Sequence, residues 1–128
     1  GQRVLVVDDN VDAADLLVDM LRRLGYDARV AHTGAAALAL VEAFSPDVAV
    51  LDIGLPLMDG YELARRLRAR PELADVRLVA LTGYGQASDR QRASGVGFDA
   101  HLVKPITIGT LLGSLKGLDD RPSMVPDE

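Results

Sequence analysis

The chain has 128 residues, of which 48% are hydrophobic, a net charge of −5 and no cysteine. This size suits one domain with one core, and the core must be aliphatic because only 4% of the residues are aromatic. The acidic balance argues against direct binding of nucleic acid, and the lack of cysteine excludes disulfides and thiol chemistry. No apolar run approaches the ~20 residues of a membrane span, and no signal peptide is visible. We therefore expect a cytoplasmic domain without membrane insertion.

Short apolar runs alternate along the chain with segments of helical period. The runs lie at 3–7, 27–31, 48–51, 78–81 and 99–103. After a first helix, the remaining helices are expected at about 34–44, 60–69, 86–94 and 107–117. This alternation predicts an α/β fold around a parallel sheet. The three strongest runs, 3–7, 48–51 and 78–81, barely alternate and should be central strands, whereas 27–31 reads as an edge strand.

The first helix has the clearest boundaries. Asn10 or Asp12 can cap its start, and Gly25 can stop it. Its core stripe is expected at Leu17, Met20, Leu21 and Leu24.

The last ten residues differ in composition from the rest of the chain. Residues 119–128 hold two prolines and four acids, which predicts a flexible tail. We assign residues 1–118 to a single domain and residues 119–128 to this tail.

Polar side chains follow the apolar runs where the runs end. Asp8 and Asp9 follow the first run, Asp52 the third, Thr82 the fourth and Lys104 the fifth. Ligand chemistry in open parallel sheets gathers at these carboxyl ends. If the three carboxylates converge, each pair repels by roughly 4 kcal/mol at ~4 Å and an effective dielectric near 20, so folding requires a cation. An oxygen-only set without histidine or cysteine suits Mg²⁺.

This set predicts phosphoryl transfer to Asp52. Its ionised carboxylate can attack phosphorus without a general base and become an aspartyl phosphate. The metal offsets charge on the acceptor and phosphoryl oxygens, Lys104 adds a second cation, and Thr82 can donate its hydroxyl. Each residue also has a plainer reading: Asp8 and Asp9 as helix caps, Lys104 as a surface lysine and Thr82 as the start of a loop.

Five motifs in this order resemble the receiver domain of two-component response regulators, of the chemotaxis-receiver type. They are Val6-Val7-Asp8-Asp9-Asn10, Leu51-Asp52-Ile53-Gly54-Leu55-Pro56, Met58-Asp59-Gly60, Leu81-Thr82-Gly83 and Lys104-Pro105. The resemblance covers Arg3 to about Leu118. It implies a doubly wound, flavodoxin-like (βα)5 fold with five helices and a five-stranded parallel sheet in the order 2-1-3-4-5.

The resemblance also implies a role for each site residue. Asp52 corresponds to the phosphoacceptor and Lys104 to the lysine that pairs with the phosphoryl group. Asp9 resembles a direct Mg²⁺ ligand and Asp8 a ligand that acts largely through water. The backbone carbonyl of Gly54 stands where the family takes a third protein ligand.

A conformational switch is part of the same resemblance. The residue at the position of Thr82 moves toward the phosphoryl group, and an aromatic residue on the fifth strand turns inward. His101 holds that position here, where Tyr or Phe is more usual, and its plainer interpretation is a half-exposed strand residue.

The Lys104–Pro105 bond is expected to be cis, as in many receivers. The other histidine, His32, is expected at a strand end near the surface, and the two histidines do not suggest a metal pair.

The implied function is regulatory rather than enzymatic. The domain takes a phosphoryl group from a histidine kinase or phosphotransfer histidine and changes its affinity for an output domain or a downstream protein. A stand-alone regulator and the receiver of a hybrid sensor histidine kinase both remain open, although the turn Ile53-Gly54-Leu55-Pro56 resembles many hybrid-kinase receivers.

Three other classes compete with this function. A Mg²⁺-dependent phosphatase of the haloacid-dehalogenase type would carry a second Asp where Gly54 stands. A flavin-binding domain would have a phosphate loop rich in Ser, Thr and Gly in place of Asp8-Asp9-Asn10. A pseudo-receiver that acts without phosphorylation is disfavoured by the intact acidic set.

Overall fold

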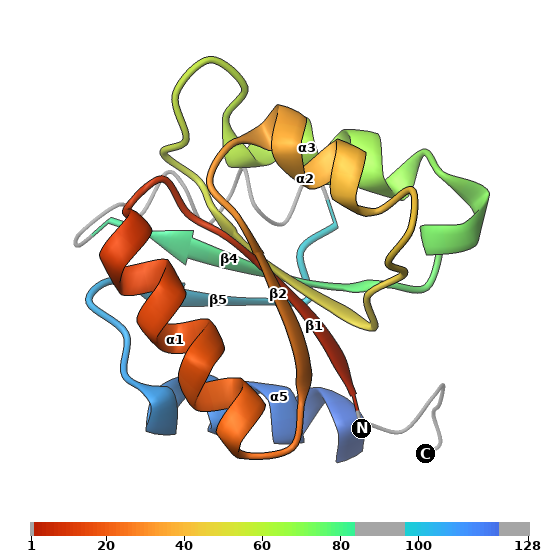
Figure 1. Ribbon diagram of the computed structural model, residues 1–128. Helices are drawn as coiled ribbons and strands as arrows, with labels where there is room; N and C mark the ends of the chain where they lie inside the picture. Colours follow the sequence, from red (N-terminus) through yellow and green to blue (C-terminus); the bar gives the residue numbers. More distant parts are fainter. Residues whose placement is uncertain (1, 84–96, 121–128) are drawn as a thin grey trace.

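The computed structural model describes residues 2–83 and 97–120 of the chain (Figure 1). Five parallel strands form one sheet in the order β2-β1-β3-β4-β5, which confirms the predicted fold class and strand order. The strands are β1 Arg3–Val7, β2 Asp27–Ala31, β3 Val48–Asp52, β4 Arg77–Thr82 and β5 Ala100–Val103.

Helices cover both faces of the sheet. They are α1 Val11–Arg23, α2 Gly34–Leu40, α3 Gly60–Arg68 and α5 Ile108–Asp120, with a 3₁₀ turn at Pro71–Leu73. The helices α1 and α5 lie on one face, and α2 and α3 lie on the other (Figure 1). The helix expected at 86–94 lies outside the described residues. Within the described ranges, no helix has the length and apolar character needed to cross a membrane.

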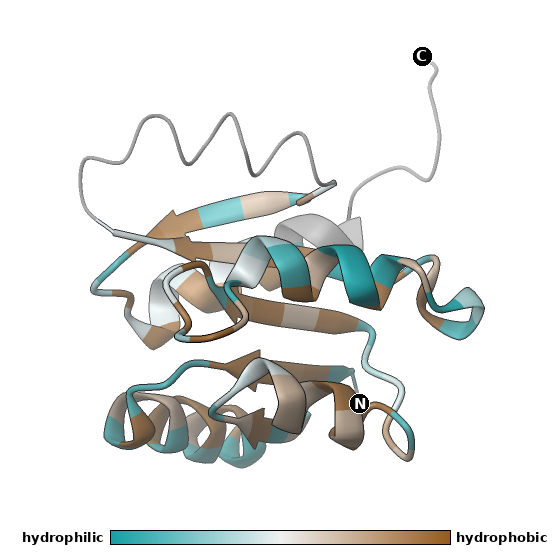
Figure 2. Cartoon of the chain, turned by 90° about the horizontal axis from the view of Figure 1, so that it is seen from above, coloured by the Kyte–Doolittle hydropathy of each residue, from teal (hydrophilic) through white to brown (hydrophobic). Residues whose placement is uncertain are grey.

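The three central strands carry the core. Every residue of β3 is buried, and β1 and β4 are each buried except at their first residue. Figure 2 shows these strands as mainly hydrophobic, whereas the helices combine hydrophobic and hydrophilic residues. Burial on both faces explains why the sequence of these strands does not alternate. The edge strand β2 is buried only in part, as its weaker pattern predicts.

The first helix begins as predicted, but its buried stripe differs from the prediction. Asn10 is the N-cap, and its side chain accepts a hydrogen bond from the backbone N–H of Ala13 at 3.1 Å. The predicted core position Leu24 is 56% exposed, because this residue is the C-cap and the chain leaves the helix through Gly25 at a φ of +98°. Leu17 and Leu21 are buried as predicted, Met20 is only partly buried, and Ala14 and Val18 complete the buried face of α1.

Two other helix ends differ from the sequence prediction. The helix predicted at 34–44 ends at Leu40, and tighter bonds follow, such as that from the N–H of Ala43 to the carbonyl of Leu40. Pro46 also disfavours helical backbone at the residue before it. The last helix continues to Asp120, past its predicted end at 117 and into the segment predicted as a tail.

Candidate functional site

The sheet register brings the polar strand ends together. Val7 pairs with Leu51, and Thr82 pairs with Val103, so β1, β3, β4 and β5 end at nearly the same level. All of the predicted site side chains therefore lie at one edge of the sheet, namely Asp8, Asp9, Asp52, Thr82 and Lys104.

Asp8, Asp9 and Asp52 form an acidic cluster, as the sequence predicts. One carboxylate oxygen from each of them lies within 4.8 Å of the others. Asp8 is 6% exposed and Asp52 is 5% exposed, whereas Asp9 is exposed. Two carboxylates are thus held in a buried position, where an isolated charge costs free energy.

Lys104 supplies the cation that the buried carboxylates need. Its Nζ lies 2.9 Å from Oδ2 of Asp52 and 3.4 Å from Oδ2 of Asp8. Burial raises the pKa of the Asp8 carboxyl, and the negative charge of Asp52 adds to this, while the N–H of Asn10 and the Lys104 ammonium lower it in part. Burial alone would lower the pKa of Lys104, but its hydrogen bond with Asp52 and the charges of Asp52 and Asp8 raise it overall.

The donor set fits a hard divalent cation. In the part of the chain that the structure describes, one ammonium lies beside this cluster of three carboxylates, so negative charge remains there, and all of the donor atoms in the acidic cluster are oxygens. Mg²⁺ prefers oxygen ligands and is usually held by one or two carboxylates together with waters and phosphate oxygens. Among the described residues, this cluster is the one group of three or more potential metal ligands.

The backbone after β3 orients Asp52. The N–H of Gly54 donates to Oδ1 of Asp52 at 3.0 Å, and the N–H of Gly60 donates to the carbonyl of Ile53 at 3.0 Å. A Cβ on Gly60 would lie 2.6 Å from the carbonyl oxygen of Asp52 and 2.8 Å from Cα of Ile53. Glycine is therefore required at residue 60, where the start of α3 crosses the strand that carries Asp52.

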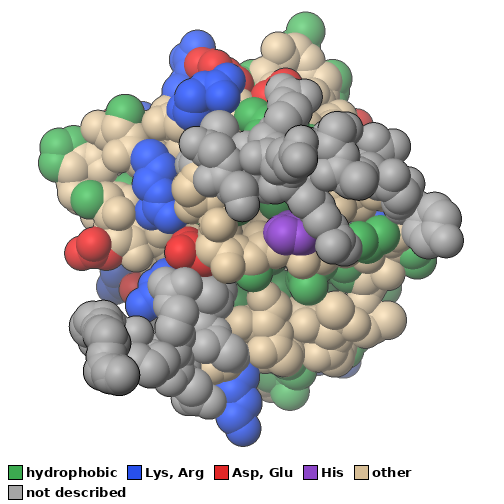
Figure 3. Space-filling model, turned by 180° about the vertical axis from the view of Figure 1, so that it is seen from behind, with side chains coloured by type: hydrophobic (Ala, Val, Ile, Leu, Met, Phe, Trp, Pro, Cys, Tyr) green, Lys and Arg blue, Asp and Glu red, His purple; other side chains and the backbone are tan. Residues whose placement is uncertain are grey.

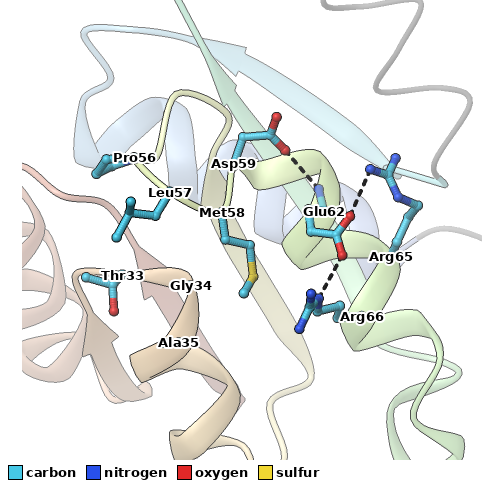
Figure 4. Close-up of a pocket in the computed structure, with 10 residues that line it drawn as sticks. All are labelled: Thr33, Gly34, Ala35, Pro56, Leu57, Met58, Asp59, Glu62, Arg65 and Arg66. Carbon is cyan, nitrogen blue, oxygen red and sulfur yellow. Dashed lines mark hydrogen bonds and ion pairs between the residues drawn. The ribbon is translucent and has the colours of Figure 1, made fainter.

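The loop between β3 and α3 contains an exposed leucine with unusual backbone geometry. Leu57 has a φ of +69°, and the N–H of Met58 donates to the carbonyl of Pro56 at 2.8 Å, the pattern of a γ-turn with positive φ. A cavity of about 570 Å³ lies beside this loop, between the first residues of α2 and the side chains of Glu62 and Arg66 (Figure 4). It shares no residue with the acidic cluster.

A second cavity, of about 580 Å³, adjoins the acidic cluster itself. Asp8 and Lys104 line one part of it, and apolar residues of α1 and of the segment before α5, including Leu16 and Ile106, line most of the rest. This cavity therefore borders two of the site residues on the α1 side of the sheet.

Thr82 and His101 lie on the same face of the sheet. Thr82 is 2% exposed, and its hydroxyl donates to the carbonyl of Leu102 at 3.4 Å. His101 pairs with Ala80, two residues before Thr82, and is half-buried. The Lys104–Pro105 bond is cis, as the resemblance implies.

One neighbour of the site was not predicted. His32 lies at a strand end and is partly exposed, as expected, but its Nδ1 also lies 2.9 Å from the backbone carbonyl of Asp8. Its Nε2 lies 3.2 Å from Oδ1 of Asp15 on α1. The predicted strand order could have indicated that His32 lies near Asp8, because His32 follows β2 and Asp8 follows the adjacent β1.

Comparisons with known proteins agree with this geometry. The family described as "Response regulator receiver domain" matches residues 4–116. The DNA-binding dual master transcriptional regulator RpaA of Synechocystis is 33% identical over 97% of this chain, and the chain spans only 52% of that protein.

Solved structures of similar proteins cover nearly the whole fold. The chemotaxis response regulator CheY4 of Vibrio cholerae has a TM-score of 0.83 and 30% identity, over 90% of this chain and 96% of that one. The receiver domain of the sensor histidine kinase PA1611 of Pseudomonas aeruginosa has a TM-score of 0.80 and 32% identity, over 91% of this chain and 95% of that one, and carries a magnesium ion in its active-site cleft. The chain belongs to the family of response regulator receiver domains, the phosphoacceptor domains of two-component signalling.

Proposed function

We propose that Asp52 is the residue that accepts the phosphoryl group, and that the donor is a phosphohistidine of a histidine kinase or phosphotransfer domain. The observation that carries this assignment is the position of the Asp52 carboxylate. It is buried at the end of β3, 2.9 Å from the Lys104 ammonium and within 4.8 Å of the other two carboxylates of the acidic cluster.

The transfer needs little from the protein beyond position and charge. A carboxylate oxygen of Asp52 forms a bond to phosphorus as the phosphorus–nitrogen bond of the phosphohistidine breaks, and the bonding electrons return to the imidazole nitrogen. Lys104 then faces a phosphoryl oxygen as well as the carboxylates, so its ammonium offsets the added negative charge.

Asp8, Asp9, Asp52 and the backbone carbonyl of Gly54 are the proposed Mg²⁺ ligands. The acidic cluster supports the three carboxylate ligands, the Gly54 carbonyl is taken from the family resemblance, and the magnesium ion in the PA1611 receiver is consistent with a metal at this site. When bound, the ion offsets charge on the acceptor and phosphoryl oxygens.

Thr82 and His101 are the proposed switch residues. The Thr82 hydroxyl can exchange its bond to the carbonyl of Leu102 for a bond to a phosphoryl oxygen. The N–H of Lys104 donates to the carbonyl of Thr82 at 2.9 Å. Movement of the Thr82 backbone would therefore also displace the segment that carries Lys104. His101 lies on the same face of the sheet and can follow this movement.

The proposed partners are a histidine kinase or phosphotransfer domain and an output domain or downstream protein. Direct binding of nucleic acid is not proposed, because the net charge is −5 and basic and acidic side chains are mixed among the coloured residues of Figure 3. We also propose a regulatory, non-enzymatic role in the cytoplasm. Gly54 stands where a phosphatase of the competing class would need a second aspartate, and the lack of cysteine fits a reducing compartment.

Intact mass after incubation with acetyl phosphate tests this function. The wild-type chain should gain one phosphoryl group only when Mg²⁺ is present, and Asp52→Asn should gain none. Asp75→Asn, at an exposed loop position, is the matched control and should behave as wild type. No adduct on the wild-type chain would favour the pseudo-receiver, and steady turnover of a small phosphate ester would favour the phosphatase.

A further inference from the structure

His32 joins the site through the main chain of Asp8. The pairing of β1 with β2 continues beyond the strands, because the N–H of Asp8 donates to the carbonyl of Ala31 at 3.1 Å. The next residue of that edge, His32, then turns its ring toward Asp8, with Nδ1 at 2.9 Å from the Asp8 carbonyl oxygen. Both polar groups of the Asp8 peptide backbone are therefore held by two consecutive residues at the end of β2.

The chemistry of the contact fixes its direction. A carbonyl oxygen accepts hydrogen bonds and cannot donate them, so Nδ1 of His32 donates to Asp8. Because the peptide group is planar, fixing this carbonyl also fixes the plane of the bond that leads to Asp9. The side chain of Asp8 is held separately, since its Oδ1 accepts a hydrogen bond from the N–H of Asn10 at 3.0 Å.

The other ring nitrogen of His32 faces a carboxylate on helix α1. Its Nε2 lies 3.2 Å from Oδ1 of Asp15, which stands about one turn after the start of α1 at Val11. The ring is 32% exposed and thus spans the space between β1 and α1 at the rim of the site. Both nitrogens face acceptors in the protein, which leaves neither of them directed at a metal ion in the acidic cluster.

We propose that His32 is a positioning residue for the metal site, which sets the orientation of the peptide group between Asp8 and Asp9 without itself binding the ion. This inference rests on the proposed Mg²⁺ site. Groups that hold metal ligands in place typically change metal affinity by about 10–100-fold when they are removed. The contact of His32 with the carbonyl between the two acidic residues gives it the same kind of control here.

Isothermal titration calorimetry of the full chain with MgCl₂ tests the proposal. In His32→Leu the side chain has similar reach but no donor, and we expect the Kd for Mg²⁺ to rise about tenfold or more. In His32→Asn the amide nitrogen stands the same number of bonds from Cα as Nδ1 and can donate to Asp8. We expect this variant to keep a Kd within about threefold of wild type, by the same reasoning.

A purely structural role predicts a different pattern. The melting temperature measured without metal would then fall in both variants, because both lose the contact with Asp15. The Kd for Mg²⁺ would stay at the wild-type value. An unchanged Kd in His32→Leu overturns the proposal. If His32→Leu does not fold, His32→Gln replaces it, since its amide lies one bond too far from Cα to reproduce the Nδ1 geometry. If the wild-type chain itself binds no Mg²⁺, the proposed metal site fails and the positioning role fails with it.

Discussion

Replacing Lys104 by methionine should separate the effect of its positive charge on stability from the effect of its side-chain packing. Methionine keeps much of the length of the side chain but removes the ammonium that faces Asp52 and Asp8. Without the ammonium, the two buried carboxylates of the acidic cluster have no cation beside them among residues 2–83 and 97–120. We expect the metal-free variant to be clearly less stable than wild type at neutral pH.

The distances set the size of this effect. At an effective dielectric of ~20, unit charges at the observed 2.9 Å and 3.4 Å attract by about 6 and about 5 kcal/mol before desolvation is subtracted. Lys104 is 34% exposed, so solvent screens part of this attraction. Removing one partner of a fully buried pair costs about 3–5 kcal/mol, and we therefore expect a loss of about 2–3 kcal/mol in the free energy of unfolding.

The pH dependence of this loss distinguishes charge from packing. The folded pKa of Asp8 is already raised above 3.8 by burial, and removing Lys104 must raise it further because Lys104 lowers it. A raised carboxyl pKa gives stability that is fully present below the unfolded value and is lost as pH rises through the folded pKa. The deficit of Lys104→Met should therefore be small near the unfolded value and grow toward neutral pH.

Urea unfolding measures this prediction. Lys116→Met, at an exposed position of α5, is the matched control and should change stability by less than about 0.5 kcal/mol. Mg²⁺ at about 100 times its Kd should return about 2.7 kcal/mol to the variant if the proposed site binds it. A deficit of equal size in acid and at neutral pH would refute the electrostatic argument, since it would point to lost packing.

Two further substitutions test the loop after Asp52. Gly60→Ala should lower the free energy of unfolding by about 2–3 kcal/mol, because its Cβ would overlap the backbone of Asp52 and Ile53, and chemical denaturation measures it. Its control, Gly113→Ala in α5, meets no atom within 4 Å and should instead gain up to about 1 kcal/mol. Leu57→Gly should raise the melting temperature slightly, since relief of about 1–2 kcal/mol of positive-φ strain exceeds the added freedom of the unfolded chain. A lower melting temperature for Leu57→Gly would show that the leucine side chain stabilises the loop.

The position of the acidic cluster could be predicted because it depends on topology alone. Asp52 directly follows a buried run, and Asp8 and Asp9 follow another, so parallel pairing of these runs must bring the three side chains to one edge. That argument does not predict how deeply Asp8 and Asp52 are buried, or which carboxylates Lys104 contacts. The same reasoning located Thr82 and Lys104, since both also end a strand.

The parts that could not be predicted depend on single side-chain directions. The ring of His32 points along the sheet edge to Asp8 rather than into solvent, and the Thr82 hydroxyl bonds the adjacent strand rather than a site residue. The γ-turn at Leu57 was hidden for another reason, because leucine is a residue that local preferences exclude from positive φ. Such choices are decided by a few atoms of tertiary context that a pattern of apolar and polar residues does not contain.

The acidic cluster is thus held in a state that its own charges oppose. Burial raises the pKa of Asp8, and Lys104 is the cation beside it and Asp52 among the described residues. A phosphoryl group on Asp52 would add negative charge at the same point, so the one ammonium would be shared among more oxygens. The protein can accept that charge only by recruiting a second cation or by moving neighbouring donors such as Thr82 toward it. On this reasoning the proposed metal requirement and the proposed conformational response have one physical origin, which is the shortage of positive charge at the ends of β1 and β3.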